Sequence, residues 1–146
     1  VITAFLRRAM DGEPPVVWGG SQKRDFTYVS DAVNLHQKCI QKQFPKAEVF
    51  NVSTGIGTTI SELAEKIRGN FGIQHETIFE DLEENMMSDF YGGRIRLPSE
   101  LQHMQLSNLK AKEELNWRHE VKLEEGLNLE FEWLQSNLEK WKKMSY

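Results

Sequence analysis

The stretch of this chain best suited to chemistry is residues 22–31, in which Arg24 is followed by Asp25. The pattern predicts a β-hairpin arm that leads directly into a helix, with Arg24 at the base of the second strand. A guanidinium held on a strand presents a planar set of donors in one orientation, and that set matches the oxygens of a phosphate. The sequence therefore predicts an anion site at Arg24. The alternative is a surface ion pair between Arg24 and Asp25 or another nearby carboxylate.

The elements on either side of Arg24 follow from hydrophobic spacing and turn residues. Apolar residues at helical spacing predict a helix over residues 1–10, which Asp11 and Gly12 end. Short apolar runs predict strands over residues 16–18 and 26–29, and Gly19-Gly20 between them completes the predicted hairpin.

A helix is expected to follow the hairpin and to run to about Gln43. Ser30 or Asp31 would cap it, because their side-chain oxygens can accept the free N–H groups of the first turn. Its predicted inner face holds Ala32, Val33, His36, Cys39 and Ile40. On that face His36 is more simply a hydrogen-bonded, semi-buried residue than a catalyst.

The strongest helix signal of the chain begins at Thr59. Thr59 and Glu62 have the spacing of a capping box, and the apolar residues behind them predict a helix that ends near Gly72. Five further elements are expected: strands over residues 48–52 and 77–79, an extended segment over 102–106, a helix from Ser107 or Asn108 to Leu115, and a long helix over 123–141.

Composition limits the kind of protein. The chain has 146 residues, 39% of them hydrophobic and 27% charged, which is typical of one soluble domain. A net charge of -4 argues against nonspecific nucleic-acid binding. The single cysteine, Cys39, forms no internal disulfide and has no metal-ligand spacing with the histidines. Without a membrane-span or signal-peptide pattern, the cytoplasm is the expected location.

Short strands that alternate with helices predict a mixed α/β (α+β) fold, a small lobe with about five helices rather than a full doubly wound sheet. The order of motifs resembles the C-terminal, substrate-binding half of the extended short-chain dehydrogenase/reductase family, the nucleotide-sugar epimerases and dehydratases. The resemblance rests on blocks in the right order across nearly the whole chain: residues 16–19, 22–33, 49–55, 59–64, 110–117 and 123–127, with Trp133 after them.

The resemblance implies an enzyme whose catalytic parts are outside this sequence. Members of the family carry a glycine-rich loop for NAD or NADP and a Tyr-x-x-x-Lys pair, both upstream of this region. Neither Tyr28 nor Tyr91 has a lysine four residues later, and no such glycine loop occurs. We therefore expect residues 1–146 to be the substrate-binding domain of a longer enzyme, inactive alone, and monomeric because family dimers form through the missing Rossmann half.

The resemblance also implies roles for individual residues. Arg24 would bind the pyrophosphate of a nucleotide sugar. A second arginine would be Arg96, with Arg94 as the other candidate and a solvated loop cation as the alternative. Val16 and Trp18 would border the nucleotide base, unless Trp18 only fills the core.

Two weaker site candidates complete this set. Gln22 would contact the ribose or simply lie in the turn, and Met104 would lie near the nucleoside or pack in the core. Arg24 and Arg96 are expected on opposite walls of one site. Nothing in the sequence selects the base, the sugar, or epimerase over dehydratase chemistry.

Other prominent residues are interpreted as structural. Phe26, Tyr28, Asn51, Trp117, Trp133 and Trp141 are expected to pack or to satisfy backbone groups. The acidic run over residues 80–84 is either a solvated face or part of a lid. The rival function is a non-catalytic binding or scaffold domain that keeps the fold and contacts a protein partner.

Overall fold

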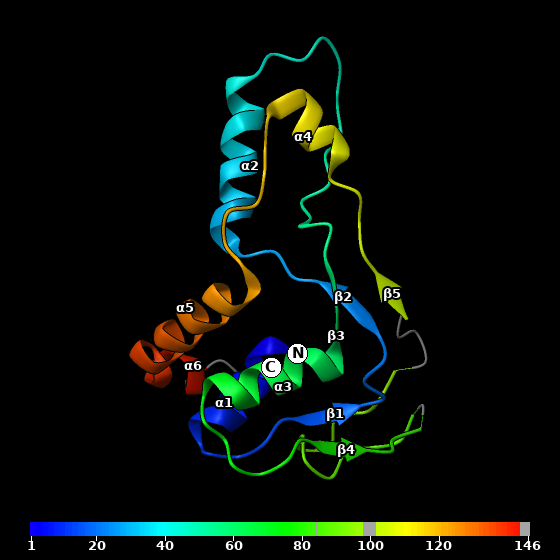
Figure 1. The fold of residues 1–146 in the computed structure, drawn as a ribbon, viewed down its shortest axis with the longest axis vertical. Coiled ribbons are helices and arrows are strands. Elements are labelled where there is room, and N and C mark those ends of the chain that lie inside the picture. The colour runs from blue at the N-terminus through cyan, green and yellow to red at the C-terminus, as the bar shows by residue number, and fades with distance from the viewer. Residues whose placement is uncertain (84, 98–101, 144–146) are drawn as a thin grey trace. The chain divides into compact units, whose positions relative to one another are not determined.

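A computed structural model describes residues 1–83, 85–97 and 102–143, with the side chains of 141–143 excepted (Figure 1). The chain forms two compact units. Unit 1 consists of Val1–Gln22, Thr59–Gln102 and Leu127–Tyr146, and unit 2 consists of Lys23–Thr58 and His103–Gly126. The expected mixture of short strands and helices is confirmed, with six helices rather than about five in the described residues.

Unit 1 is built from helices packed on a two-stranded parallel sheet. Helix α3 (Ile60–Asn70) packs against α1 (Ile2–Met10) and against β1 (Val16–Trp18). Strand β1 pairs in parallel with β4 (Ile78–Glu80). The apolar residues buried in this unit are Phe5, Leu6, Ala9, Val16, Val17, Ile60, Leu63, Ala64, Ile67, Ile73, Leu82, Leu127 and Leu134.

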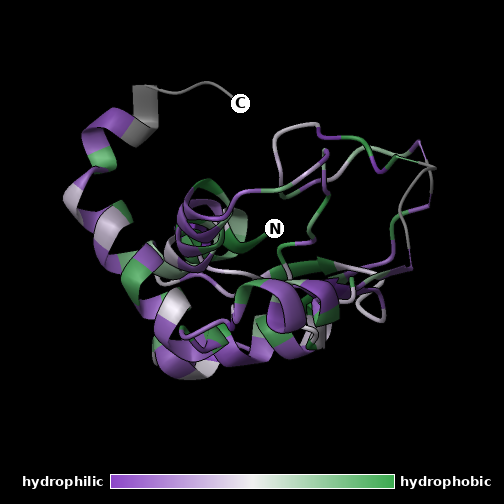
Figure 2. Ribbon diagram, turned by 90° about the horizontal axis from the view of Figure 1, so that it is seen from above, coloured by the Kyte–Doolittle hydropathy of each residue, from purple (hydrophilic) through white to green (hydrophobic). Residues whose placement is uncertain are grey.

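The predicted capping box begins α3. Thr59 Oγ1 accepts the Glu62 N–H at 3.1 Å, and Glu62 Oε2 accepts the Thr59 N–H at 2.8 Å. These two bonds satisfy donors that the first helical turn leaves without partners. Hydrophobic and hydrophilic residues alternate around the helices, as Figure 2 shows by colour, so each helix can bury one face.

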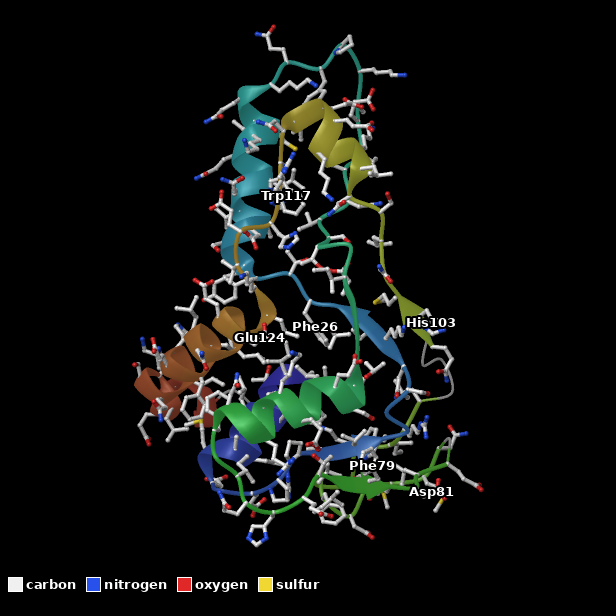
Figure 3. All side chains as sticks on the ribbon, viewed as in Figure 1. Phe26, Phe79, Asp81, His103, Trp117 and Glu124 are labelled. Carbon is white, nitrogen blue, oxygen red and sulfur yellow. The ribbon has the colours of Figure 1, made fainter. Side chains whose placement is uncertain are left out.

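Unit 2 combines a small sheet with a helical pair. Strand β2 (Lys23–Asp25) is the middle strand, between β3 (Gly57–Thr59) and β5 (His103–Met104), and it runs parallel to β5. Helix α2 (Val29–Gln41) packs against α4 (Leu109–Leu115). Their core is Leu35, Ala111, Leu115 and Trp117. In Figure 3 Trp117 lies between the two helices, as its predicted structural role requires.

The predicted β-hairpin is wrong. Strands β1 and β2 belong to different sheets, and β2 ends at Asp25 instead of beginning at Phe26. The linking turn does not reverse the chain onto itself, because its carbonyls accept hydrogen bonds from the start of α3. Ser61 N–H donates to the Gly20 carbonyl and Ile60 N–H to the Gln22 carbonyl, both at 3.0 Å.

The predicted cap and inner face of α2 are also wrong. Tyr28 precedes the helix and no side chain caps it. The Asp31 carboxylate is buried and accepts instead from the N–H groups of Glu120 and Val121, at 2.9 and 3.3 Å. The helix therefore buries the face with Leu35 and leaves most of the predicted inner face exposed: Val33, His36 and Ile40.

Two further expectations fail for local reasons. Residues 48–52 form no strand, and the Val49 carbonyl accepts from Lys110 instead of from a neighbouring strand. The long last helix is broken at Asn137 into α5 (Leu123–Ser136) and α6 (Leu138–Lys143). The Asn137 amide donates to the Trp133 carbonyl at 2.9 Å and so competes with the helical backbone pattern.

The predictions for Trp133, Asn51 and Trp141 have different outcomes. Trp133 is 46% exposed, so it is not a core residue, and its other expected role, in helix packing, stays a prediction. Asn51 satisfies a backbone group as expected, because its Nδ2 donates to the Ser107 carbonyl. The side chain of Trp141 lies outside the described residues. No helix in the described ranges is both long and apolar enough to cross a membrane.

Candidate functional site

Arg24 lies at the centre of the sheet in unit 2. Its Cα is the register partner of Met104 on β5, so the structure brings these two predicted site residues together. The Arg24 side chain is half-buried, and its Nη1 donates to the Lys23 carbonyl at 2.9 Å. Met104 is 50% exposed and therefore does not fill the core, which was its alternative role.

Asp25, the next residue on β2, is not the surface ion-pair partner of Arg24. Its carboxylate accepts four hydrogen bonds from one tripeptide. Ser53 Oγ lies 2.6 Å from Oδ2, and the Gly55 N–H donates to the same oxygen at 2.9 Å. Thr54 donates its N–H and its hydroxyl to Oδ1 at 2.9 and 2.7 Å. These contacts fix the loop over residues 53–55, which we call the Ser53 loop, to the middle strand.

In unit 1 the predicted residues collect around the turn after β1. The side chain of Gln22 is 2% exposed. Its Nε2 donates to the Trp18 carbonyl at 2.7 Å, and its Oε1 accepts from the Gly20 N–H at 2.5 Å. The structure thus favours the turn role of Gln22 over a contact with ribose. A side chain at Gly20 would collide with Ser61 Oγ, and the φ of 104° there also favours glycine.

Arg96 lies against this same turn. A Cβ at Gly19 would be 3.3 Å from Arg96 Nη2 and 3.3 Å from Gln22 Oε1. Arg96 Nη1 also donates to the Leu82 carbonyl at 2.6 Å. The backbone positions Arg96 at the end of an antiparallel hairpin, in which Met87 faces Ile95. Arg94 is exposed on that hairpin, so of the two candidates Arg96 is the one next to the turn.

Trp18 is held by a network that the sequence did not reveal. Its Nε1 donates to Glu80 Oε2 at 2.6 Å, and its ring meets Tyr91 edge-on at 5.6 Å between centroids. Glu80 also accepts from Ser88 Oγ at 2.7 Å and from the Asp89 N–H at 2.8 Å. The Tyr91 hydroxyl donates to the Val16 carbonyl at 2.9 Å, so the backbone of Val16, a residue expected to border a base, already accepts a side-chain hydrogen bond.

Two titratable groups of this network are perturbed. Burial disfavours the charged form of Glu80, but hydrogen bonds from Ser88, from the Asp89 amide and from Trp18 together lower the pKa of its carboxyl. Burial raises the pKa of the Tyr91 hydroxyl above its ordinary value. Glu80 is thus a fixed anion rather than part of a solvated face, and Leu82 after it is buried. The lid stays a prediction, and Glu84 lies outside the described residues.

The sequence-predicted site residues therefore fall into two groups. Unit 2 holds Arg24 and Met104, and unit 1 holds Val16, Trp18, Gln22, Arg94 and Arg96. The expectation that Arg24 and Arg96 face each other stays a prediction. Asp25, Glu80, Ser88 and Tyr91 were missed as organising residues. A serine eight residues after Glu80, followed by a glycine turn, was the only local sign of the unit 1 network.

The N-terminus of α3 does not fit the pyrophosphate of a dinucleotide cofactor. Gly55 and Gly57 precede α3, which is where a glycine loop would lie. However, the first N–H groups of that helix already donate hydrogen bonds within the chain. The Ile60 N–H donates to the Gln22 carbonyl, the Ser61 N–H to the Gly20 carbonyl, and the Glu62 N–H to Thr59 Oγ1. No group of three or more His, Cys, Asp or Glu suited to a metal ion occurs in the described part of the chain.

A family model described as GDP-mannose 4,6 dehydratase matches residues 1–129. The chain belongs to this family. The match confirms the extended short-chain dehydrogenase/reductase resemblance, and the NAD-dependent nucleotide-sugar epimerases and dehydratases are its relatives.

Among curated relatives, a putative UDP-glucose 4-epimerase of Methanocaldococcus jannaschii is 27% identical over 94% of this chain and 39% of its own length. The GDP-L-fucose synthase of Escherichia coli is 28% identical over 97% of this chain and 44% of its own length. The chain thus spans about two fifths of these relatives, 39% and 44%.

Solved structures agree on the fold. The UDP-glucose 4-epimerase of Thermotoga maritima, solved with UDP-glucose, superposes with a TM-score of 0.76 at 30% identity, over 94% of this chain and 40% of that one. A Bordetella bronchiseptica enzyme solved with NADH gives a TM-score of 0.74 at 28% identity, over 98% of this chain and 38% of the other. The fold matches the C-terminal portion of the epimerase structures.

Proposed function

We propose that residues 1–146 are the substrate-binding domain of an NAD(P)-dependent nucleotide-sugar epimerase or dehydratase, and that Arg24 binds the diphosphate of the substrate. In the whole enzyme, NAD or NADP would be held by a glycine-rich domain outside this chain, and that domain would supply the acid and base for hydride and proton transfer. The chain alone would bind without catalysing, as a monomer, and in the cytoplasm.

The observation that carries the proposal is the position of Arg24. It lies on the middle strand of a three-stranded sheet, is half-buried, and has Met104 beside it at the same register. A guanidinium on such a strand loses little rotational freedom when it binds two phosphate oxygens. Tight binding of the unreactive diphosphate would orient the sugar for reaction in the whole enzyme.

The residues of unit 1 have separate proposed roles. Arg96 is a second phosphate ligand, held by the turn at Gly19. Trp18 offers an indole ring that its bond to Glu80 and its edge contact with Tyr91 keep in one orientation, as the face of a nucleotide base requires. Gln22 acts indirectly, because it holds the turn that follows Trp18 and that Arg96 lies against.

Calorimetric titration with UDP, GDP and their sugars tests the proposal. Replacement Arg24→Ala is expected to weaken binding by about 2–3 kcal/mol, the size of a charge-assisted hydrogen bond. Arg118→Ala is the matched control, because it removes the same charge from an exposed position of unit 2 and should leave affinity unchanged.

Equal affinities of wild type and Arg24→Ala would remove Arg24 from the site. A wild-type chain that binds none of these nucleotides would favour the rival function, a binding domain for a protein partner.

A further inference from the structure

We propose that Asp25 is a positioning residue for the diphosphate site, and that it acts on substrate through Arg24 without touching substrate itself. The inference rests on the proposed function of Arg24. The observation behind it is that one carboxylate ties the strand that carries Arg24 to the segments that flank it in unit 2.

Arg24 and Asp25 are neighbours on β2. Successive residues of a strand point to opposite faces, so the Asp25 carboxylate is directed away from the Arg24 guanidinium. It cannot share an anion with Arg24 on the same face. The four hydrogen bonds that it accepts come from the Ser53 loop, with distances between 2.6 and 2.9 Å.

The Ser53 loop also contacts the segment that follows β5, through its hydroxyl and carbonyl groups. The Ser53 hydroxyl lies 2.6 Å from the Leu106 carbonyl as well as 2.6 Å from Asp25, so its single proton is shared between two acceptors. Gln105 Nε2 donates to the Gly55 carbonyl at 2.6 Å, and Asn108 Nδ2 donates to the Ser53 carbonyl at 2.8 Å.

These contacts lie next to both outer strands of the sheet in unit 2. The Ser53 loop leads into β3, and residues 105–108 lead out of β5. Strand β2 lies between β3 and β5. Strand β5 has only two residues, too few to fix its own register by ladder hydrogen bonds alone. Asp25 therefore determines how both neighbours flank the residue that binds the anion.

The test is a double-mutant cycle on affinity for UDP, with GDP as a second probe, in the full 146-residue chain. Asp25→Asn keeps the shape but places an amide N–H against the Gly55 N–H. If Asp25 acts through Arg24, we expect Asp25→Asn to weaken binding about tenfold in the wild type and less than twofold in the Arg24→Ala background. A residue with an independent effect would give the same factor in both backgrounds.

Asp31→Asn is the matched control. Asp31 is another carboxylate of unit 2 that accepts two backbone N–H groups, but its partners are Glu120 and Val121 rather than neighbours of β2. It should lower stability without a change in affinity. Amide hydrogen exchange of the unliganded chain gives a second measurement, in which Asp25→Asn but not Asp31→Asn should speed exchange at residues 23–25 and 103–104.

If Asp25→Asn does not fold, Ser53→Ala replaces it, because it breaks the shared bond between Asp25 and Leu106 while it keeps the carboxylate. We then expect a loss of about threefold that also disappears in the Arg24→Ala background. Equal factors in both backgrounds, or unchanged affinity, would overturn the role of Asp25 alone. A wild-type chain that binds neither UDP nor GDP would overturn the proposed function, and this assignment with it.

Discussion

Each unit of the molecule ends a strand with a carboxylate that organises a loop, but the two do so over different distances in sequence. Asp25 ends β2 and binds the Ser53 loop, 28 to 30 residues ahead. Glu80 ends β4 and binds Ser88 and Asp89, eight and nine residues ahead. Glu80 also holds Trp18, 62 residues behind it. The same device therefore fixes a local hairpin in unit 1 and a distant loop in unit 2.

The difference shows what each carboxylate stabilises. In unit 2 all donors come from one tripeptide, so the loss of Asp25 removes the acceptor of the Thr54 N–H and leaves the Gly55 N–H with only its longer bond to Ser53 Oγ, at 3.1 Å. In unit 1 one donor is a backbone N–H and two are side chains, which can find water more easily. Asp25 should thus matter more for stability, whereas Glu80 should matter more for the orientation of one aromatic ring.

The comparison is tested most directly by removal of each carboxylate. We expect Asp25→Ala to lower the free energy of unfolding by about 2–4 kcal/mol and Glu80→Ala by about 1–2 kcal/mol, because Asp25 accepts four hydrogen bonds, two of them from backbone N–H groups, and Glu80 accepts three, one of them from the backbone. Urea unfolding of both variants at pH 7 measures the two losses. A larger loss for Glu80→Ala would reverse the comparison.

The dependence of stability on pH tests whether Glu80 stabilises unit 1 through its charge. Folding lowers the pKa of Glu80, so its stabilising effect is complete above the ordinary glutamate value of 4.5 and is lost as the pH falls through the lowered value. The stability difference between wild type and Glu80→Gln should therefore shrink as the pH falls below 4.5.

This difference has to be measured between variants rather than on the wild type alone. Glu65 also has a lowered pKa, caused by hydrogen bonds from Arg68 and Thr77 and by the charge of Arg68, so it titrates in the same range. Urea unfolding at pH 7 and at acid pH, on both proteins, isolates Glu80. A difference that stays constant with pH would assign its effect to packing instead of charge.

The smallest effect concerns the hydroxyl that Tyr91 donates to the Val16 carbonyl. Tyr91→Phe keeps the edge contact with Trp18 and removes only that bond, so we expect a loss of about 0.5–1.5 kcal/mol. Thermal unfolding by circular dichroism measures it. A much larger loss would mean that the bond to Val16 also keeps the Tyr91 ring in position against Trp18.

The sequence predicted features that depend on local contacts, and it missed those that depend on residues far apart in the chain. The capping box at Thr59 and the core face of α3 were predicted correctly because both signals lie within one helix. The strand Val16–Trp18 was also found, since its apolar run is short and bounded by turn residues. The family, too, was recognised from short blocks in order.

The failures share a physical cause. Asp31 has the composition of a helix cap, but donors 89 and 90 residues away take its carboxylate. Strand β2 pairs with β5, some 80 residues later, and no local pattern announces such a partner. Glu80 resembled a solvated charge because the residues that bind it come from β1 and a later hairpin. Candidate site residues such as Arg24 could be named from the sequence and stay predictions, whereas the loop-binding carboxylates Asp25 and Glu80 were not found.

The division of the chain between its two units has a consequence for folding order and for truncation. Unit 1 is assembled from three separate segments and unit 2 from two, so the chain passes from one unit to the other four times. Neither unit can be completed from one continuous piece, and each must close long loops before its core forms. A chain cut after Gly126 would retain every segment of unit 2 but remove Leu127 and Leu134 from the buried residues of unit 1.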